Sequence, residues 1–185
     1  MGPLPVVFVG CGTMEKPNLI TVAWTGIVNS DPAMTYVSIR PQRHSHKLIE
    51  EGGCFTINLA TSSMVRKLDA CGVYTGAKMN KFEKFSLTPL SSQNIAAPCV
   101  QESPLILECK VERKISLGSH DMFLAKIEAV VVEDHLLNEK GKLCLGKADL
   151  ITYSHGDYLS LGKKLGSFGF SVKKNKAHKQ QRGKK

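Results

Sequence analysis

The sequence predicts a mainly β fold, arranged as a barrel with short helices around it. Segments rich in β-branched and aromatic residues recur along the 185-residue chain, whereas helical patterns are few and short. Residues 105–112 alternate between apolar and largely charged side chains, the period of two of a strand with one buried face. Six or more strands with such short helices favour a barrel over alternating βαβ units.

The expected elements follow from these patterns in chain order. Strands are expected over Val6–Val9, Leu19–Ser30, Met34–Arg40, Cys54–Leu59, Leu105–Arg113, Met122–Asp134 and Leu150–Tyr153. Short helices are expected over His46–Glu51, Ser63–Ala70, Lys78–Phe82 and Tyr158–Leu165. Segment Ser86–Ser103 is rich in Ser, Pro, Asn and Gln and is expected to be a long connecting loop. In the strand at 105–113, Ile106 and Glu108 should belong to the outward face.

Thr21–His46 joins a hairpin to a cluster of phosphate-type donors. Two β-rich runs flank Asp31-Pro32, a turn dipeptide that neither a helix nor a central strand tolerates well. The next donors fall within six residues, just before an expected helix: Arg40, Arg43, His44 and Ser45. Guanidinium and hydroxyl donors at a helix N-terminus suit a phosphate. The alternative is an ordinary solvated loop, and spacing alone leaves both interpretations open.

The length and composition predict one soluble domain. A chain of 185 residues, 42% of them hydrophobic, can bury a substantial core but is short for two domains. It has no apolar run of about 18 residues. The apolar stretch PLPVVFV is short and follows no basic residues, so no secretory signal is expected either. We therefore expect a cytoplasmic protein.

The six cysteines are expected to be reduced thiols. They are widely separated, and the chain has no Cys-x-x-Cys pair. A metal site is not expected, because the only close pair, His44 and His46, would point in different directions on either a strand or a helix.

The net charge of +9 comes mainly from the C-terminal end. Residues 173–185 hold seven lysines and arginines and no acid, which leaves +2 for residues 1–172. We interpret 1–172 as the folded domain and 173–185 as a basic, disordered, solubilising tail. A nucleic-acid-binding arm is the alternative for this tail.

Two nucleotide-binding motifs are incomplete in this chain. Residues 6–12 look like the start of a dinucleotide fingerprint, but Glu15 stands at the third glycine position and Pro17 follows where a helix should run. Gly162-Lys163-Lys164 lacks the first glycine and the hydroxyl residue of a phosphate loop. The sequence thus shows no independent nicotinamide site and no triphosphate site.

A second donor-rich block spans Cys71–Phe82, where Thr75 and Lys81 can donate to an anion and glycines allow close backbone approach. Taken in order, several blocks resemble the flavin reductase-like, FMN-binding split-barrel family: PN-x-ITVAW from Pro17, the Asp31-Pro32 hairpin, VSIRPQRHSHKLI from Val37, F-x-INL from Phe55 and CG-x-x-TG-x-x-x-NKF from Cys71. The chain is most similar to the flavoredoxin branch, including the terminal YLSLG-x-x-LGSFGFSVKK from Tyr158. The similarity runs from about Val6 to Val172.

This resemblance implies a homodimer of six-stranded split barrels, with one FMN per subunit near the interface and the flavin ring against the first hairpin. The family usually has Ser-Gly and Asp-Lys-Phe in the second block, where this chain has Thr75-Gly76 and Asn80-Lys81-Phe82. Thr75 keeps the hydroxyl. Asn80 removes a negative charge, which puts any role of that carboxylate in question but should not harm the binding of a dianionic phosphate.

The resemblance also implies the residues of the FMN site. The flavin ring would be lined by Thr21, Ala23, Trp24 and Thr25, and its pocket completed by Asn58 and Leu59 on the neighbouring strand. The ribityl chain and phosphate would be held by Ser38, Arg40, His44 and Ser45. The phosphate side would be closed, in concert with the partner subunit, by Cys71, Gly72, Thr75 and Lys81. Without the resemblance, Trp24 would be interpreted as core filler and Cys71 as an inert buried thiol.

Two functions fit this resemblance. One is an oxidoreductase, an NAD(P)H-dependent flavin reductase that passes electrons on to free flavin, a metal complex or a protein. The other is an FMN electron carrier that exchanges electrons with a redox protein without turning over nicotinamide. In both, the flavin performs the redox chemistry, so no catalytic acid or base of the protein is required. A pyridoxamine-phosphate oxidase shares the barrel, but the blocks match the flavin reductases better.

Overall fold

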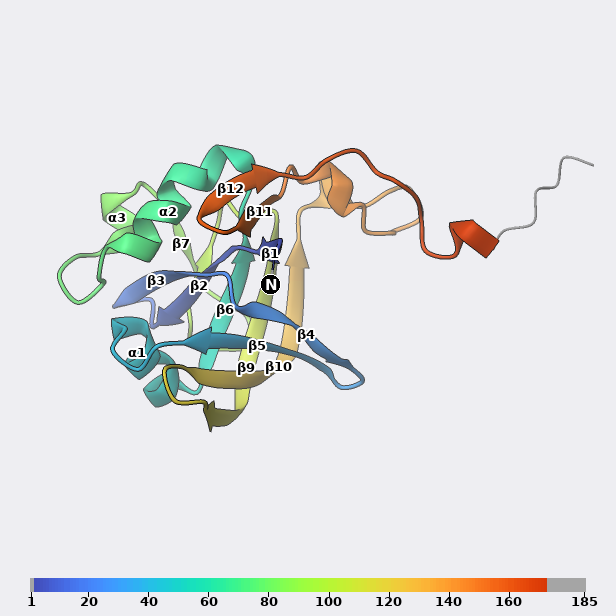
Figure 1. The fold of residues 1–185 in the computed structure, drawn as a ribbon. Helices are drawn as coiled ribbons and strands as arrows, with labels where there is room; N and C mark the ends of the chain where they lie inside the picture. The colour runs from blue at the N-terminus through green and yellow to red at the C-terminus, as the bar shows by residue number, and fades with distance from the viewer. Residues whose placement is uncertain (1, 173–185) are drawn as a thin grey trace, which may run out of the picture.

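The computed structural model describes residues 2–172 of the chain. Its main feature is an antiparallel sheet with the strand order β3-β2-β6-β9-β10-β5-β4 (Figure 1). In chain order its seven strands are β2 (Val7–Gly12), β3 (Pro17–Val22), β4 (Thr25–Ser30), β5 (Ala33–Ile39), β6 (Cys54–Leu59), β9 (Leu105–Ser116) and β10 (Asp121–Val132). The mainly β fold is therefore confirmed. Strands β4 and β5 form the predicted hairpin, with Ser30 opposite Ala33 around the Asp31-Pro32 turn.

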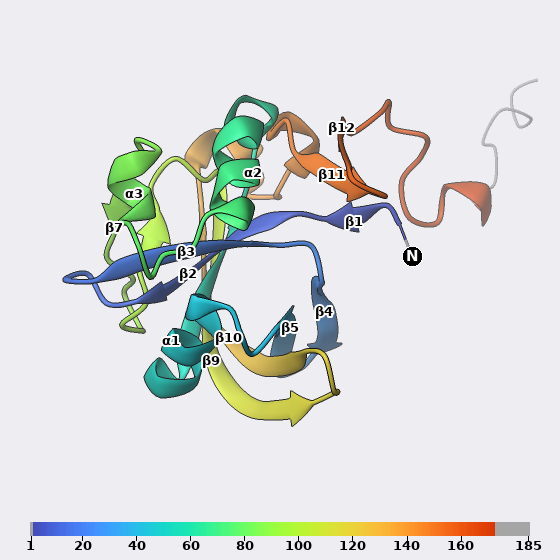
Figure 2. The same cartoon turned by 60° about the vertical axis from the view of Figure 1, so that its left-hand side comes forward.

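Strands β3 and β4 follow each other in the chain but lie at opposite ends of this sheet. Ala23 and Trp24 connect them, and the Trp24 carbonyl oxygen accepts a hydrogen bond from the Ser38 amide at 2.9 Å. The sheet thus curls until its two ends meet at this connection, which we call the seam (Figure 2). The prediction of one continuous strand over Leu19–Ser30 is wrong for this reason, and the sheet has seven strands instead of six.

Two apolar clusters hold the fold together. The first fills the inside of the curled sheet, where Phe55 and Phe123 are almost fully buried with Ile49 of α1 (His44–Gly52). The second lies on the other face of β2 and β3, where Phe8 packs with residues of α2 (Val65–Val73) and α3 (Lys81–Lys84). Each such large side chain contributes about 1.5–3 kcal/mol by burial. The helices of the two clusters flank the open edge of β3.

The predicted helices at 46–51 and 63–70 are confirmed, the second beginning as the 3₁₀ turn Ser62–Met64. Helix α3 begins at Lys81, later than predicted, because the side-chain oxygen of Asn80 accepts a hydrogen bond from the Phe82 amide at 3.0 Å and caps the helix. Asn80 thus keeps a structural role that an aspartate would also fill.

The helix predicted over Tyr158–Leu165 is wrong. Strand β12 (Asp157–Ser160) pairs instead with β11 (Ile151–Ser154), which also pairs with β1 (Leu4–Pro5). The turn between β11 and β12 contains Gly156 with φ 101°, a left-handed conformation that glycine adopts without strain. Further 3₁₀ turns occupy Asp134–Leu136, Leu145–Lys147 and Phe170–Val172.

The connecting segment Ser86–Ser103 is mostly irregular but contains the short hairpin of β7 (Pro89–Leu90) and β8 (Cys99–Val100). It covers part of β9, where the Glu108 carboxylate accepts hydrogen bonds from the amides of Gln93 and Asn94 at 2.8 and 2.9 Å. The prediction that Ile106 and Glu108 lie on an exposed face is therefore wrong, because both are buried.

The predicted basic tail, 173–185, lies outside the described residues. Within residues 2–172, no helix combines the length and apolar character needed to cross a membrane. All six cysteines are described, and none is disulfide-bonded. In the same range, no three His, Cys, Asp or Glu side chains are placed to hold a metal ion together.

Candidate functional site

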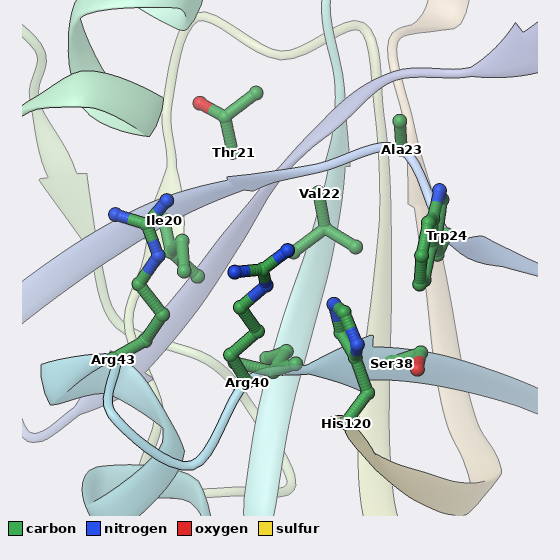
Figure 3. Close-up of a pocket in the computed structure, with 10 residues that line it drawn as sticks. Ile20, Thr21, Val22, Ala23, Trp24, Ser38, Arg40, Arg43 and His120 are labelled. Atoms are coloured by element: carbon green, nitrogen blue, oxygen red, sulfur yellow. The ribbon is translucent and has the colours of Figure 1, made fainter. Parts of the chain in front are cut away.

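A pocket of about 170 Å³ lies at the seam, and we call it the seam pocket (Figure 3). The end of β3 and the connection after it form one wall, and the end of β5 forms the other; the lining residues are Ile20, Thr21, Val22, Ala23, Trp24, Ser38, Ile39, Arg40, Arg43 and His120. Five consecutive residues, 20–24, line it although their side chains alternate in direction, so the backbone itself forms that wall. Because β3 is a terminal strand, its outer edge has no further strand to bond to.

Two aromatic rings stand at one end of the seam pocket. Trp24 and His120 have ring centroids 4.4 Å apart at an interplanar angle of 35°, and Figure 3 shows them side by side. Trp24 is 52% exposed, so the interpretation of this residue as core filler is wrong. Burial, and then the positive charge of Arg40, lower the pKa of His120. The Trp24 and His120 rings are therefore both uncharged at neutral pH.

A second pocket of about 100 Å³ adjoins the first, since Ile20 and Arg43 line both. We call it the cation pocket; its other lining residues are Gln42, His44, Ser45, Cys71, Gly72, Tyr74, Thr75, Gly76 and Lys81. Arg43 and Lys81 bring positive charge to it, and Arg40 stands in the adjoining seam pocket. No aspartate or glutamate among the described residues lines either pocket. Such a site favours an anion.

Lys81 is the most deeply buried charge in the cation pocket, with 2% of its surface exposed. Its Nζ donates hydrogen bonds to the carbonyl oxygens of Leu19 and Cys71, both at 2.7 Å. An ammonium has three N–H groups, so one is left for a ligand. Burial lowers the pKa of Lys81, and within residues 2–172 no carboxylate forms a salt bridge with it. An anion bound here would offset the cost of the buried charge.

The N-terminus of α1 forms the opposite wall of the cation pocket through His44 and Ser45. The N-cap residue Arg43 makes no side-chain capping bond, because a guanidinium carries only donors. The positive end of the α1 dipole thus faces the pocket, and the side chain of the N-cap residue provides no acceptor for the first backbone amides of the helix. Helix N-termini of this kind bind phosphate readily.

The thiol of Cys71 also lies at this pocket. Burial raises the pKa of Cys71 to about 11, so it is a protonated thiol at neutral pH. This agrees with the interpretation of Cys71 as an inert group. The backbone carbonyl oxygen of Cys71, by contrast, accepts a hydrogen bond from Lys81.

Most of the predicted site residues line the two pockets. In the seam pocket these are Thr21, Ala23, Trp24, Ser38 and Arg40, and in the cation pocket His44, Ser45, Cys71, Gly72, Thr75 and Lys81. Segments more than forty residues apart in the sequence are thus brought together. Their role in ligand binding remains a prediction.

Three predicted residues line neither pocket. The Thr25 hydroxyl donates to the Tyr36 carbonyl oxygen at 2.6 Å. Asn58 is buried, and its side-chain oxygen accepts from the Val100 amide at 2.8 Å, while Leu59 packs against the inner cluster. The strand that carries Asn58 and Leu59, β6, is not the neighbour of β3 as expected, because β2 lies between them. The role of these residues in ligand binding stays a prediction.

The structure adds residues that the predicted site lacked. Arg43 belonged to the donor cluster but was not assigned, and it lines both pockets. His120 comes from the turn between β9 and β10, far from every other site residue in the sequence. Only its position beside Trp24 in the fold reveals it.

The sequence model of the flavin reductase-like domain matches residues 2–162. The chain belongs to this family. Its fold is similar to the flavoredoxin of Desulfovibrio vulgaris (Miyazaki F), with a TM-score of 0.87 and 30% identity over 94% of each chain. The flavoredoxin of Methanosarcina acetivorans has a TM-score of 0.84 and 28% identity, covering 92% of this chain and 93% of that one. An NADH-dependent FMN reductase of Streptomyces nodosus subsp. asukaensis is 25% identical over 130 residues, 69% of each chain.

These comparisons confirm the family and the split-barrel flavoprotein fold that the sequence blocks predicted. The flavin reductase-like site also suits FMN chemically. The cation pocket offers ammonium, guanidinium and hydroxyl donors without a carboxylate, as a dianionic phosphate requires. The seam pocket offers a backbone edge and aromatic side chains, which suit the polar edge and the apolar faces of a flavin ring.

Proposed function

We propose that this protein binds FMN across the two adjoining pockets and reduces it with NAD(P)H as a flavin reductase. The observation that supports this most is the pairing of a buried, acid-free cation pocket with an aromatic, solvent-open seam pocket along a free strand edge. The cation pocket suits a phosphate and the flexible chain attached to it. The seam pocket suits a redox-active ring that must remain accessible to an electron donor or acceptor.

FMN, when bound, supplies the hydride and electron transfer chemistry. The protein's own groups bind and orient. Lys81 and Arg43 would hold the phosphate, and the backbone edge of β3 would offer hydrogen-bonding groups to the ring. Trp24 and His120 would contact the ring at one end of the seam pocket and leave it accessible to a reactant. None of these groups needs to gain or lose a proton.

Two observations bear on the choice between a flavin reductase and an FMN electron carrier. The relative from Streptomyces nodosus is an NADH-dependent FMN reductase, and the half-exposed Trp24 leaves the seam pocket open enough for a small donor. The flavoredoxin neighbours favour the alternative, an electron carrier without nicotinamide turnover. An accessible ring suits both functions, so our choice of the reductase rests on the NADH-dependent relative from Streptomyces nodosus.

Anaerobic reduction of the FMN-loaded protein tests the choice. NADH and NADPH are added separately, and bleaching of the flavin absorbance is followed by stopped flow. Rapid bleaching by either nucleotide is expected. Bleaching only by dithionite or a reduced redox protein would contradict the reductase and favour the carrier. Failure of the purified protein to retain FMN at all would contradict both.

We also propose that the functional unit is a homodimer. Segment 161–172 extends away from the body in both views (Figures 1 and 2) and exposes Leu165 and Phe168 almost completely. Edge strand β4 exposes Ile27 and Val28. Apolar surface of this kind marks association, and a second copy offers the same two surfaces in return.

Light scattering after size exclusion measures this association. The full-length chain should have twice the monomer mass, and Phe168→Ser with Leu165→Ser should shift it towards the monomer. Leu90→Ser, an exposed leucine elsewhere, is the matched control and should leave the mass unchanged. A monomeric full-length chain at micromolar concentration would contradict the proposal.

A further inference from the structure

Asn18 is a buried residue of β3 that stands directly behind the cation pocket. Only 4% of its surface is exposed. Its Nδ2 donates hydrogen bonds to Ser45 Oγ at 2.8 Å and to Cys11 Sγ at 3.2 Å. Asn18 does not line the pocket, but its amide group touches the first turn of α1, which does.

The bond from Asn18 determines what the Ser45 hydroxyl can do. Because Ser45 Oγ accepts from Asn18, the hydroxyl hydrogen of Ser45 needs a different acceptor. Among the described residues, no nitrogen or oxygen accepts a hydrogen bond from this hydroxyl. The sulfur of Cys11 is within hydrogen-bonding reach of the Ser45 hydroxyl, but burial raises the pKa of Cys11 to about 11. A protonated thiol is a weak acceptor, so an anion in the cation pocket would compete well for the Ser45 hydrogen. Ser45 is therefore oriented as a donor, and it lines the cation pocket.

The other end of the Asn18 amide lies against the loop that closes the pocket. A Cβ at Gly76 would be 1.8 Å from Asn18 Oδ1, so only glycine permits this approach. Oδ1 is buried and has no hydrogen-bond partner. Such an unpaired oxygen costs stability. Asn18 is thus held, at a cost, between the first turn of α1 and the Thr75-Gly76 turn, the two walls of the cation pocket.

We propose that Asn18 is a positioning residue for the phosphate of FMN. It directs the Ser45 hydroxyl into the cation pocket as a hydrogen-bond donor and spaces α1 from the Thr75-Gly76 turn. This role rests on the proposed function, because it assumes that the anion in the pocket is the FMN phosphate. It requires no contact between Asn18 and the ligand.

The test compares FMN with riboflavin, which has the same ring and ribityl chain but no phosphate. Both are titrated into flavin-free, full-length protein, and the affinity ratio is measured by flavin fluorescence. Asn18→Asp should lower the preference for FMN about tenfold or more, because a carboxylate accepts from Ser45 and turns its hydroxyl away from the pocket. Riboflavin affinity should change less than twofold.

A double-mutant cycle isolates the mechanism. Ser45→Ala should lower the preference for FMN by a similar factor, and Asn18→Ala should lower it no further when added to Ser45→Ala. Thr56→Val is the control, because Thr56 is a buried residue whose hydroxyl donates to the Pro98 carbonyl oxygen, away from both pockets. Thermal unfolding without flavin shows how much stability each variant loses.

Three results would overturn the role of Asn18. One is an unchanged preference for FMN in both Asn18 variants. Another is an equal loss of FMN and riboflavin affinity, the result that general destabilisation produces and that the Thr56→Val control calibrates. The third is full additivity of Asn18→Ala and Ser45→Ala. If the unmodified protein bound riboflavin as tightly as FMN, the proposed FMN function itself would fail, and the role of Asn18 with it.

Discussion

The cation pocket and the seam pocket adjoin, but they are built in opposite ways. In the cation pocket, Lys81 and Ser45 are almost fully buried, and their positions are held by hydrogen bonds to the backbone and to Asn18. In the seam pocket, Trp24 is half exposed, and its contacts there are a ring neighbour and the backbone bond to Ser38. A rigid, charged site provides affinity, whereas an open one leaves a bound group accessible.

This difference separates anchoring from reactivity along one ligand. Buried charges in a dry setting bind strongly because water screens them little. An exposed aromatic site contributes less to affinity but permits approach by a second reactant. Substitutions at the two ends should therefore affect different measurements.

The largest expected effect comes from Lys81→Met. The change removes the most buried cation of the pocket and leaves the carbonyl oxygens of Leu19 and Cys71 without their donor. FMN affinity should fall about 100-fold, the loss of one strong charge-assisted hydrogen bond. Isothermal titration measures it. Lys67→Met is the control and should bind FMN normally, because Lys67 is a half-buried lysine outside both pockets that donates to the Ser86 carbonyl oxygen.

Arg43→Ala should have the next largest effect, because Arg43 lines both pockets. We expect FMN affinity to fall about 30-fold, and about tenfold for Arg40→Ala, which lines the seam pocket alone. The exposed Arg113→Ala on β9 serves as the control in the same titration. Equal losses at Arg40 and Arg43 would argue against a phosphate centred in the cation pocket.

Trp24→Ala should change the rate of flavin reduction more than it changes FMN affinity. FMN affinity should fall less than about fivefold, because the half-exposed ring contributes only part of its burial energy. The rate of flavin reduction by NAD(P)H should change by more than this factor, since the ring environment is altered. A loss of FMN affinity as large as that of Lys81→Met would refute the division of roles between the pockets.

The smallest effect concerns pH. Because the pKa of His120 is lowered in the folded protein, the unfolded chain binds more protons below its ordinary value of about 6.5. The His120 contribution should leave stability unaffected above that pH and decrease it as pH falls from there through the folded pKa. Urea unfolding at pH 7.5 and 5.5 measures the slope, which should shrink in His120→Gln and, more weakly, in Arg40→Ala. An unchanged slope in His120→Gln would show that other groups cause it.

Local patterns predicted the strands and the donors well. The Asp31-Pro32 turn located the hairpin, and both donor blocks proved to line adjoining pockets. Contacts set by the curl of the sheet were not predictable in this way. The break at Ala23-Trp24 and the approach of His120 to Trp24 depend on which strands become neighbours. The strand that carries Asn58 and Leu59 was misplaced for the same reason, since spacing along the chain does not tell that β2 lies between β6 and β3.

The seam has a consequence for how the molecule opens. The walls of the seam pocket come from β3, at one end of the sheet order, and from β5, next to the other end, with four strands pairing between them. A ligand that spans both pockets would therefore hold β3 and β5 together across the seam. At a ligand concentration 100 times the dissociation constant, the bound ligand would add about 2.7 kcal/mol to the free energy of unfolding. Hydrogen exchange at the amides of residues 20–24 should then slow as the ligand occupies the pockets. The exchange rate of these amides would therefore report how much of the protein has ligand bound.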